Sequence, residues 1–444
     1  GSFCINGLIG PDRRVHPGLW ELKKVHEPVT VEPVDLSARR VKITNRYAFA
    51  DLSGLTGVWE VDAGGQTVQS GELARLDLAP GASGEVTIPY DHPDSVPGME
   101  CWLSLSFRLA QGTACAPKGH EVAWAQFPLP THRTQPFPTR DPSPPLTLQE
   151  IGSELILSGR DFALVFARDS GRLVRWHAQG RSLIQQGPQA NLWRAPTDND
   201  AVRMAALWQA AGLDRLGEQV LALSTERISD GLVRVQVETV DKEVGVACSY
   251  AYTVSGSGEV VLAHRVQLLK ALPSLPRVGI KLLIPGEYNQ VAWYGRGPHE
   301  TYADRMRGAR VGVYHGVADG RDLPYIVPQE YGNRTEVRWA ALTNEDGAGL
   351  LVAGMPWLNV SAYPYLASDL AVAQHSHELE PREDITLNLD LAQSGLGTES
   401  CGPGQLPQYR LEADAYQYTM RLRAISGIAD LPLGLSRLAK STSQ

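Results

Sequence analysis

The chain has few cysteines, no long hydrophobic run and no excess of basic residues. Its five cysteines are scattered and form no Cys-x-x-Cys pair, which argues against a structural zinc site and predicts reduced thiols in a cytoplasmic protein. No stretch of about 18 apolar residues is present, so we expect no membrane-spanning helix. The formal net charge of −8 and the pI near 5.8 argue against nucleic-acid and anionic-membrane partners, because these select a basic surface.

Apolar and polar residues alternate with a period of two in much of the chain, as in half-buried antiparallel strands. The clearest segments are residues 41–49, 102–109 and 232–240. In the first of them, one predicted face carries Val41, Ile43, Tyr47 and Phe49. Gly-rich turns interrupt such segments at 62–65, 79–84 and 255–258. Short strands with Gly-rich turns predict β-sandwiches, so the predicted fold class is all-β.

Two segments depart from this pattern. Residues 200–216 are rich in Ala, Leu and Met and follow Asp200, so we expect one helix with Asp200 as its N-cap. Residues 129–146 contain six prolines and no periodicity, which predicts a stiff, extended linker. The stretch before the linker, 27–128, has the length of one immunoglobulin-like sandwich, and the much longer stretch after it predicts an expanded sandwich.

The segment NLWRAPTDND, residues 191–200, places three acidic or amide side chains in a row. Asp198, Asn199 and Asp200 could bind a cation or the hydroxyls of a sugar. The alternative, which the spacing favours, is a loop that enters a helix and uses Asp200 as the cap.

A second polar segment, residues 291–314, mixes aromatic and charged side chains more densely than the rest of the chain. A carbohydrate site needs this mixture, because aromatic planes and paired donors and acceptors together recognise a sugar. The alternative is a buried network around Asp304 and Arg305 that orders a long loop. The residues alone leave both interpretations open.

Two further sets of side chains would carry chemistry if they met in space. His375 and His377 have the His-x-His spacing of some metal sites, but no third ligand follows, so structural roles are favoured. A retaining glycosidase needs two carboxyl groups about 5 Å apart. Glu300, Glu330 and Glu336 lie in loop-rich stretches, and nothing in the sequence pairs them.

Five collinear segments together resemble the carboxy-terminal part of the large bacterial β-galactosidases of glycoside hydrolase family 2. They read FCINGLIGPDRRVHPGLWELKKV, NLWRAPTDND, WYGRGPHETYADR, PYIVPQEYGNRTEVRW and GLGTESCGP. In that family a catalytic barrel precedes an immunoglobulin-like domain and a β-supersandwich related to galactose mutarotases. The resemblance implies a barrel-strand stub at 1–26, an immunoglobulin-like sandwich at 27–128, a linker at 129–146, a supersandwich at 147–435 and a tail at 436–444.

The resemblance also implies that both catalytic glutamates lie upstream, so this chain has no catalytic residue of its own. Phe3, through its carbonyl, and Asn6, through its side-chain oxygen, are implied to bind substrate and a sodium ion. Oxygen ligands suit a hard cation, and the carboxyl ends of barrel strands face the substrate. Sodium and magnesium are implied only for the full-length enzyme, since no complete metal site is expected in this chain.

At two positions the chain departs from the family pattern. Thr386 stands where the family has a tryptophan platform for the leaving group, so Thr386 is a substrate-binding position without the stacking energy of about 1 kcal/mol. Acceptor specificity should therefore differ. Val202 replaces a glycine hinge in the mobile loop of the family.

The predicted function is the accessory and assembly portion of a β-galactosidase that hydrolyses terminal β-D-galactosides such as lactose. The implied partners are a β-galactoside substrate, the catalytic barrel and further copies in a homo-oligomer, and the chain alone is expected to be inactive. One alternative is a free-standing, non-catalytic carbohydrate-binding subunit. Another is an aldose 1-epimerase-like enzyme, which needs a glutamate base and a histidine acid in one pocket.

Overall fold

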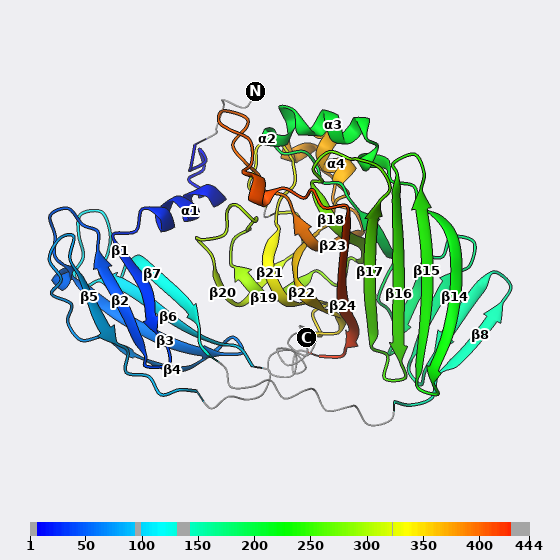
Figure 1. The fold of residues 1–444 in the computed structure, drawn as a ribbon, viewed down its shortest axis with the longest axis horizontal. Helices are drawn as coiled ribbons and strands as arrows, with labels where there is room; N and C mark the ends of the chain where they lie inside the picture. The colour runs from blue at the N-terminus through cyan, green and yellow to red at the C-terminus, as the bar shows by residue number, and fades with distance from the viewer. Residues whose placement is uncertain (1–6, 94–98, 131–142, 322, 428–444) are drawn as a thin grey trace. The chain divides into compact units, whose positions relative to one another are not determined.

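The computed structural model describes residues 7–93, 99–130, 143–321 and 323–427, which form two compact units (Figure 1). The first unit holds the strands from residue 29 to residue 128, and the second holds those from 147 to 425. The predicted linker lies mostly outside the described residues, as does the predicted tail. Phe3 and Asn6, the predicted sodium ligands, also lie outside the described residues.

The first unit is a sandwich of two antiparallel sheets. One sheet has the order β1-β2-β5, and its strands are β1 (Val29–Asp35), β2 (Arg40–Asn45) and β5 (Ser83–Thr87). The other has the order β4-β3-β6-β7, and its strands are β3 (Leu55–Ala63), β4 (Gln66–Glu72), β6 (Cys101–Leu109) and β7 (Glu121–Pro128). This arrangement is immunoglobulin-like. Helix α1 (Pro17–Val25) precedes the first strand and was not predicted.

The alternating pattern predicts the sandwich core well along β6 and less well along β2. Leu103, Leu105 and Phe107 are completely buried, as their spacing predicts. The expected strand through residue 49 is wrong, because β2 ends at Asn45 and Phe49 is 98% exposed. The buried Asn45 side chain accepts from Tyr47 N and donates to Ala50 O, both at 2.9 Å, and so turns the chain out of the strand.

The second unit contains two further antiparallel sheets among the described residues (Figure 1). The smaller sheet has the order β12-β11-β10-β9-β8, with β8 (Thr147–Ile151), β9 (Glu154–Ser158), β10 (Phe162–Ala167), β11 (Leu173–Ala178) and β12 (Arg181–Ser182). The larger sheet contains β13 (Gln186–Asn191), β14 (Gln219–Ser229), β15 (Leu232–Asp241), β16 (Val246–Ser255), β17 (Val260–Leu268), β18 (Arg277–Pro285), β19 (Gln290–Gly297), β20 (Arg310–Val317), β21 (Arg334–Thr343), β22 (Gly349–Tyr363), β23 (Asp384–Gln393) and β24 (Ala415–Ile425).

A large apolar cluster forms the main core of the second unit, and a smaller one contains Tyr331, Tyr363 and Leu370. Val233, Val235 and Val237 of β15 lie in the main core at 2% exposure or less, as the alternation in residues 232–240 predicts. The Gly-rich turn predicted at 255–258 joins β16 to β17, and Gly258 has a φ of +81° there. The predicted all-β class is confirmed: an immunoglobulin-like sandwich is followed along the chain by a larger unit built of two antiparallel sheets.

The single helix expected at 200–216 is wrong in its boundaries. Thr197 is the N-cap, and its hydroxyl accepts from Asp200 N while the Asp200 carboxylate accepts from Thr197 N. Asp200 is therefore the third helical residue of a capping box. The segment then breaks into α2 (Asp198–Ala201), α3 (Met204–Ala210) and a 3-10 turn, with α4 (Ala367–Val372) elsewhere. No helix in the described parts of the chain is long and apolar enough to cross a membrane.

Candidate functional site

One face of the second unit's larger sheet is polar where β13, β18, β23 and β22 run side by side. The register pairs Gln189 with Lys281, Lys281 with Asn388 and Asn388 with Ser361, so these four side chains form a row on one face. The alternate residues, such as Leu387, enter the apolar core. A sheet that buries one face in the core therefore presents a line of hydrogen-bonding groups on the other face.

Two members of this polar row, Asn388 and Ser361, are buried. Asn388 is 1% exposed, and its Nδ2 donates to Ser361 Oγ at 3.0 Å and to Tyr363 Oη at 3.1 Å. The amides of Asn388 and Asn191 lie 2.9 Å apart. Burial raises the pKa of Tyr363 above its ordinary value, so this phenol stays protonated at neutral pH. These contacts hold the row in a fixed geometry.

Next to the row lies a buried ionic cluster, which we call the Arg277 cluster (Arg277, Glu330, Asp390 and Gln393). Arg277 Nη2 donates to Glu330 Oε1 at 2.6 Å, and Arg277 Nε lies 2.9 Å from Asp390 Oδ2. Gln393 Nε2 donates to both carboxylates at 3.3 Å. One guanidinium thus forms ion pairs with two buried carboxylates. Burial raises the pKa of Asp390 to about 7, although Arg277 opposes this rise and Glu330 adds to it.

The predicted 191–200 motif is a structural loop. Arg194 is fully buried, and its Nε and Nη2 donate to the two oxygens of Asp200 at 2.9 and 2.8 Å. Its Nη1 donates to Ser394 O at 3.0 Å. Asn199 Nδ2 donates to Gly397 O at 2.8 Å. The side chains of Arg194 and Asn199 therefore join this loop to the 394–397 loop, and Asp200 holds Arg194 in place, which supports the interpretation of this motif as a helix-entry loop.

The Asp304 and Arg305 network predicted in residues 291–314 is also present. The two oxygens of Asp304 accept from Leu396 N at 3.0 Å and Gly397 N at 2.8 Å. Arg305 pairs with Glu300, which is 5% exposed. Asp304 thus holds the 396–397 loop to the segment that carries the Arg305 ion pair. These contacts agree with the interpretation of Asp304 and Arg305 as residues that order a long loop.

Each glutamate considered as a catalytic carboxylate is held by an arginine. Glu300 pairs with Arg305 and Glu330 with Arg277, both buried, and Glu336 accepts from Arg296 Nε at 2.9 Å. Glu330 and Asp390 share Arg277, but both side chains are 0% exposed, so no glycosidic bond can reach between them. In this region each of these carboxylates is therefore held in an ion pair with an arginine, which stabilises the fold.

The two histidines at 375 and 377 lie at a 3-10 turn, Ser376–Glu378. Their rings stack with centroids 5.4 Å apart, and His375 Nδ1 lies 3.0 Å from Glu378 Oε1. In the ranges that the structure describes, no group of three or more His, Cys, Asp or Glu side chains is placed to hold a metal ion. Structural roles for His375 and His377 agree with this geometry.

A cavity of about 90 Å³ opens beside the polar row, and we call it the Thr386 cavity. Its wall includes Gln189, Asn191, Trp193, Lys281, Tyr363, Thr386 and Asn388. Thr386 lies on β23 and is 3% exposed, so it carries no surface platform for stacking. Val202, at the predicted hinge position, is 57% exposed and helical, with a φ of −64° that needs no glycine.

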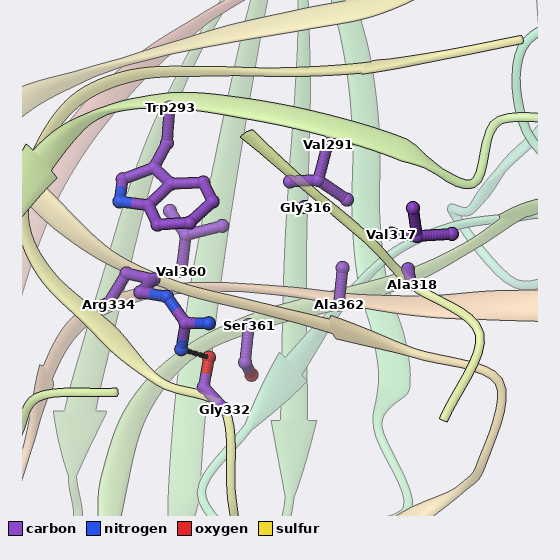
Figure 2. A pocket seen from close by; sticks show the side chains of 10 residues that line it. All are labelled: Val291, Trp293, Gly316, Val317, Ala318, Gly332, Arg334, Val360, Ser361 and Ala362. Carbon is purple, nitrogen blue, oxygen red and sulfur yellow. Dashed lines mark hydrogen bonds between the residues drawn. The ribbon is translucent and has the colours of Figure 1, made fainter. Parts of the chain in front are cut away.

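Figure 2 shows a second, smaller cavity between β19, β20 and β22, with the Trp293 indole on one wall. The Arg334 guanidinium lies 4.9 Å from the centre of the indole ring, and its Nη1 donates to Gly332 O at 2.7 Å. Trp293 is only 4% exposed and also packs on Tyr314. Its ring faces are therefore used within the protein. Neither cavity brings a histidine and a glutamate together in its described wall, as an epimerase would need.

The chain matches two known families of protein domains. Residues 158–422 match the β-galactosidase small chain, and residues 41–130 match β-galactosidase domain 4. The chain belongs to the β-galactosidase small chain family. These matches, in this order, confirm the predicted resemblance to the carboxy-terminal part of a β-galactosidase.

Curated relatives agree with the family. A β-galactosidase of Priestia megaterium is 31% identical over 432 residues, covering 96% of this chain and 41% of the relative. A β-galactosidase of Vibrio cholerae is 32% identical over 437 residues, covering 95% of this chain and 41% of the relative. The chain thus spans about two fifths of the length of these relatives. A galactose 1-epimerase from Lactobacillus acidophilus is 8% identical with a TM-score of 0.33 over 64% of this chain and 98% of that one, a likeness too slight to support an argument.

The sequence reasoning missed the polar row and the Arg277 cluster. A signal for both was available in residues 385–390, where Thr386, Asn388 and Asp390 alternate with apolar residues. A polar face of this kind on a strand inside a large domain indicates a second, hydrogen-bonded layer. Arg277 gave no such signal, because its two carboxylate partners come from distant segments.

Proposed function

We propose that this chain is the non-catalytic, accessory portion of a cytoplasmic β-galactosidase and completes the edge of its active site. The observation that carries the proposal is the order of its two domains, which follows β-galactosidase domain 4 and the β-galactosidase small chain. The substrate would be a terminal β-D-galactoside such as lactose. Cys115, Cys248 and Cys401 form no disulfide among the described residues, which agrees with a reducing compartment.

The state of the carboxylates supports a non-catalytic role. Retaining glycosidases need an accessible pair of carboxyl groups about 5 Å apart on either side of the scissile bond. Glu330 and Asp390, which share a guanidinium, are inaccessible. The proposal therefore places the reacting carboxylates on the catalytic barrel, the partner domain, and gives this chain the tasks of support, assembly into a homo-oligomer and substrate positioning.

Asn6 provides the experiment, because it is proposed to ligate sodium together with the Phe3 carbonyl in the full-length enzyme. Asn6→Ala should weaken galactose binding and reduce its dependence on sodium concentration, while the thermal unfolding of the protein stays unchanged. Gln111→Ala, which removes an amide from an exposed loop, is the matched control. Unchanged galactose affinity and sodium response in Asn6→Ala would remove the support for this residue's role.

A further inference from the structure

A third cavity, of about 420 Å³, lies in the second unit, and we call it the Arg423 cavity. It shares no wall residue with the Thr386 cavity. Its wall includes Arg160, Asp161, Phe162, Gln179, Ser257 and Arg423. Pockets for small organic ligands have volumes of roughly 300–1,000 Å³. The Arg423 cavity therefore has the size of a ligand site, whereas the cavities of about 90 and 50 Å³ are smaller.

Arg423 lies in this wall without an ion pair among the described residues. It stands near the end of β24, and its Nε is buried with no hydrogen-bond partner in the described parts of the chain. Arg421, two residues earlier on the same face of the strand, has its guanidinium 3.7 Å from the Glu259 carboxylate. A buried guanidinium normally has a partner, because burial removes the hydration of its charge. Arg423 therefore lacks a counter-charge that an anionic ligand in the cavity can supply.

A second arginine makes the wall positively charged. Arg160 lies in the turn between β9 and β10, is exposed, and forms no ion pair within the ranges that the structure describes. Asp161 is the one carboxylate residue in the described wall, so the formal charge of the wall is +1. Glu259, which follows the wall residue Gly258, is 6% exposed and already faces Arg421. In a chain with a net charge of −8, this local positive charge favours an anion.

Backbone hydrogen bonds fix the turns that carry these side chains. Gln179 N donates to Asp161 O at 2.8 Å, and Gly256 N donates to Gly231 O at 2.9 Å. Phe162, half-buried at the start of β10, adds an aromatic surface to the same wall. The wall thus combines cationic groups with an apolar surface in a fixed frame, which suits an anion that has an organic body.

We propose that the Arg423 cavity binds a small organic anion through a phosphate or carboxylate group that accepts hydrogen bonds from Arg423 and Arg160. A guanidinium donates two parallel N–H groups to such an anion, a geometry that a single neutral hydroxyl does not match. The body of the ligand lies against Phe162. The cavity has room for about 14 waters at roughly 30 Å³ each, which is more than inorganic phosphate fills alone. This binding does not depend on the proposed role in β-galactoside hydrolysis, so either proposal can fail without the other.

The test is titration of the intact chain with citrate, adenosine monophosphate and inorganic phosphate at low ionic strength, by calorimetry and by ligand-observed NMR. Citrate reports on recognition of carboxylates, and adenosine monophosphate reports on recognition of phosphates. We expect saturable binding of at least one of these two organic anions, tighter than that of inorganic phosphate because Phe162 contacts the organic body. Added sodium chloride should weaken the binding, because salt screens the attraction between charges. Glucose, which is neutral, should bind more weakly than the organic anions.

Three substitutions test the roles of the wall residues. Arg423→Gln should weaken binding about tenfold, as expected for the loss of a hydrogen bond between charged groups. Arg160→Gln, at an exposed position, should weaken it about two- to fivefold. Asp161→Asn removes the opposing charge and should strengthen binding by a similar factor. Arg234→Gln is the matched control, because the Arg234 side chain is 43% exposed and pairs with Glu226 outside the cavity.

Three outcomes would overturn the proposal. The first is no saturable binding of either organic anion, which would leave water as the cavity's only guest. The second is equal weakening by Arg234→Gln and Arg423→Gln, because binding would then follow the overall charge of the chain. The third is binding of glucose or of inorganic phosphate that is as tight as that of the organic anions. If Arg423→Gln unfolds more readily than the parent chain, Arg423→Lys and the exposed Arg160→Gln replace it, and each should bind the anion more weakly than the parent chain.

Discussion

The Arg277 cluster allows the sharpest prediction about stability. Replacing Arg277 with methionine keeps most of the side-chain volume and removes the guanidinium that serves Glu330 and Asp390. Arg277 is 1% exposed and both carboxylates are 0% exposed, so neither carboxylate can recover its hydration. Breaking a buried ion pair from one side costs about 3–5 kcal/mol, because an uncompensated charge remains inside. We expect Arg277→Met to lose about that much unfolding free energy at pH 8.

Urea unfolding followed by tryptophan fluorescence measures this loss, with the transition of the second unit analysed separately from that of the first. Arg382→Met is the matched control. Arg382 forms a bidentate pair with Asp369 at 2.6 and 2.8 Å, but its side chain is 48% exposed. Solvent screens such a pair, so its loss should cost no more than about 1 kcal/mol.

A rescue variant tests the cause of the loss. Adding Glu330→Gln and Asp390→Asn to Arg277→Met removes the uncompensated charges, and most of the lost stability should return. If Arg277→Met costs no more than Arg382→Met, burial does not set the cost of losing the ion pair. If the triple variant is less stable than Arg277→Met alone, charge is not the source of the loss.

Three further predictions concern pH and the loops. Burial raises the pKa of Asp390 from 3.8 to about 7, so between these pH values the folded chain holds a proton that the unfolded chain releases. The free energy of unfolding should therefore fall as the pH rises from 3.8 to about 7. Asp390→Asn should flatten this part of the pH profile. Asp304→Ala removes two hydrogen bonds to a charged group, and should cost about 2 kcal/mol and speed amide exchange at Gly397. Thr197→Ala removes the N-cap of α2 and should cost about 1 kcal/mol in thermal unfolding.

The sequence predicts much of this fold because each strand has one apolar face and one face that is solvent-exposed or hydrogen-bonded. Residues 102–109 and 232–240 are strands with the predicted inward residues. The failure at Phe49 has a local cause that the alternation does not contain. The Asn45 side chain hydrogen bonds the backbone beyond it, and this side-chain contact ends the strand while the apolar pattern continues.

The candidate site was less predictable, since its parts meet only through the fold. Arg277 joins carboxylates 53 residues away, at Glu330, and much further away, at Asp390. No spacing rule connects such positions. Asp200 was predicted as a helix cap and is part of a capping box, but its pairing with the buried Arg194 follows only from the structure. The family resemblance located Thr386, and the structure showed it buried in a cavity wall.

We propose that this chain supports β-galactoside hydrolysis without supplying the reacting carboxylates. The most direct measurement is the rate at which the purified chain alone hydrolyses nitrophenyl β-D-galactoside, compared with full-length enzyme that contains it. We expect the rate for the chain alone to be indistinguishable from that of the buffer, and robust turnover for the full-length enzyme. Turnover by the chain alone that is abolished by Glu330→Gln, in a variant that still folds, would show that this chain carries a reacting carboxylate.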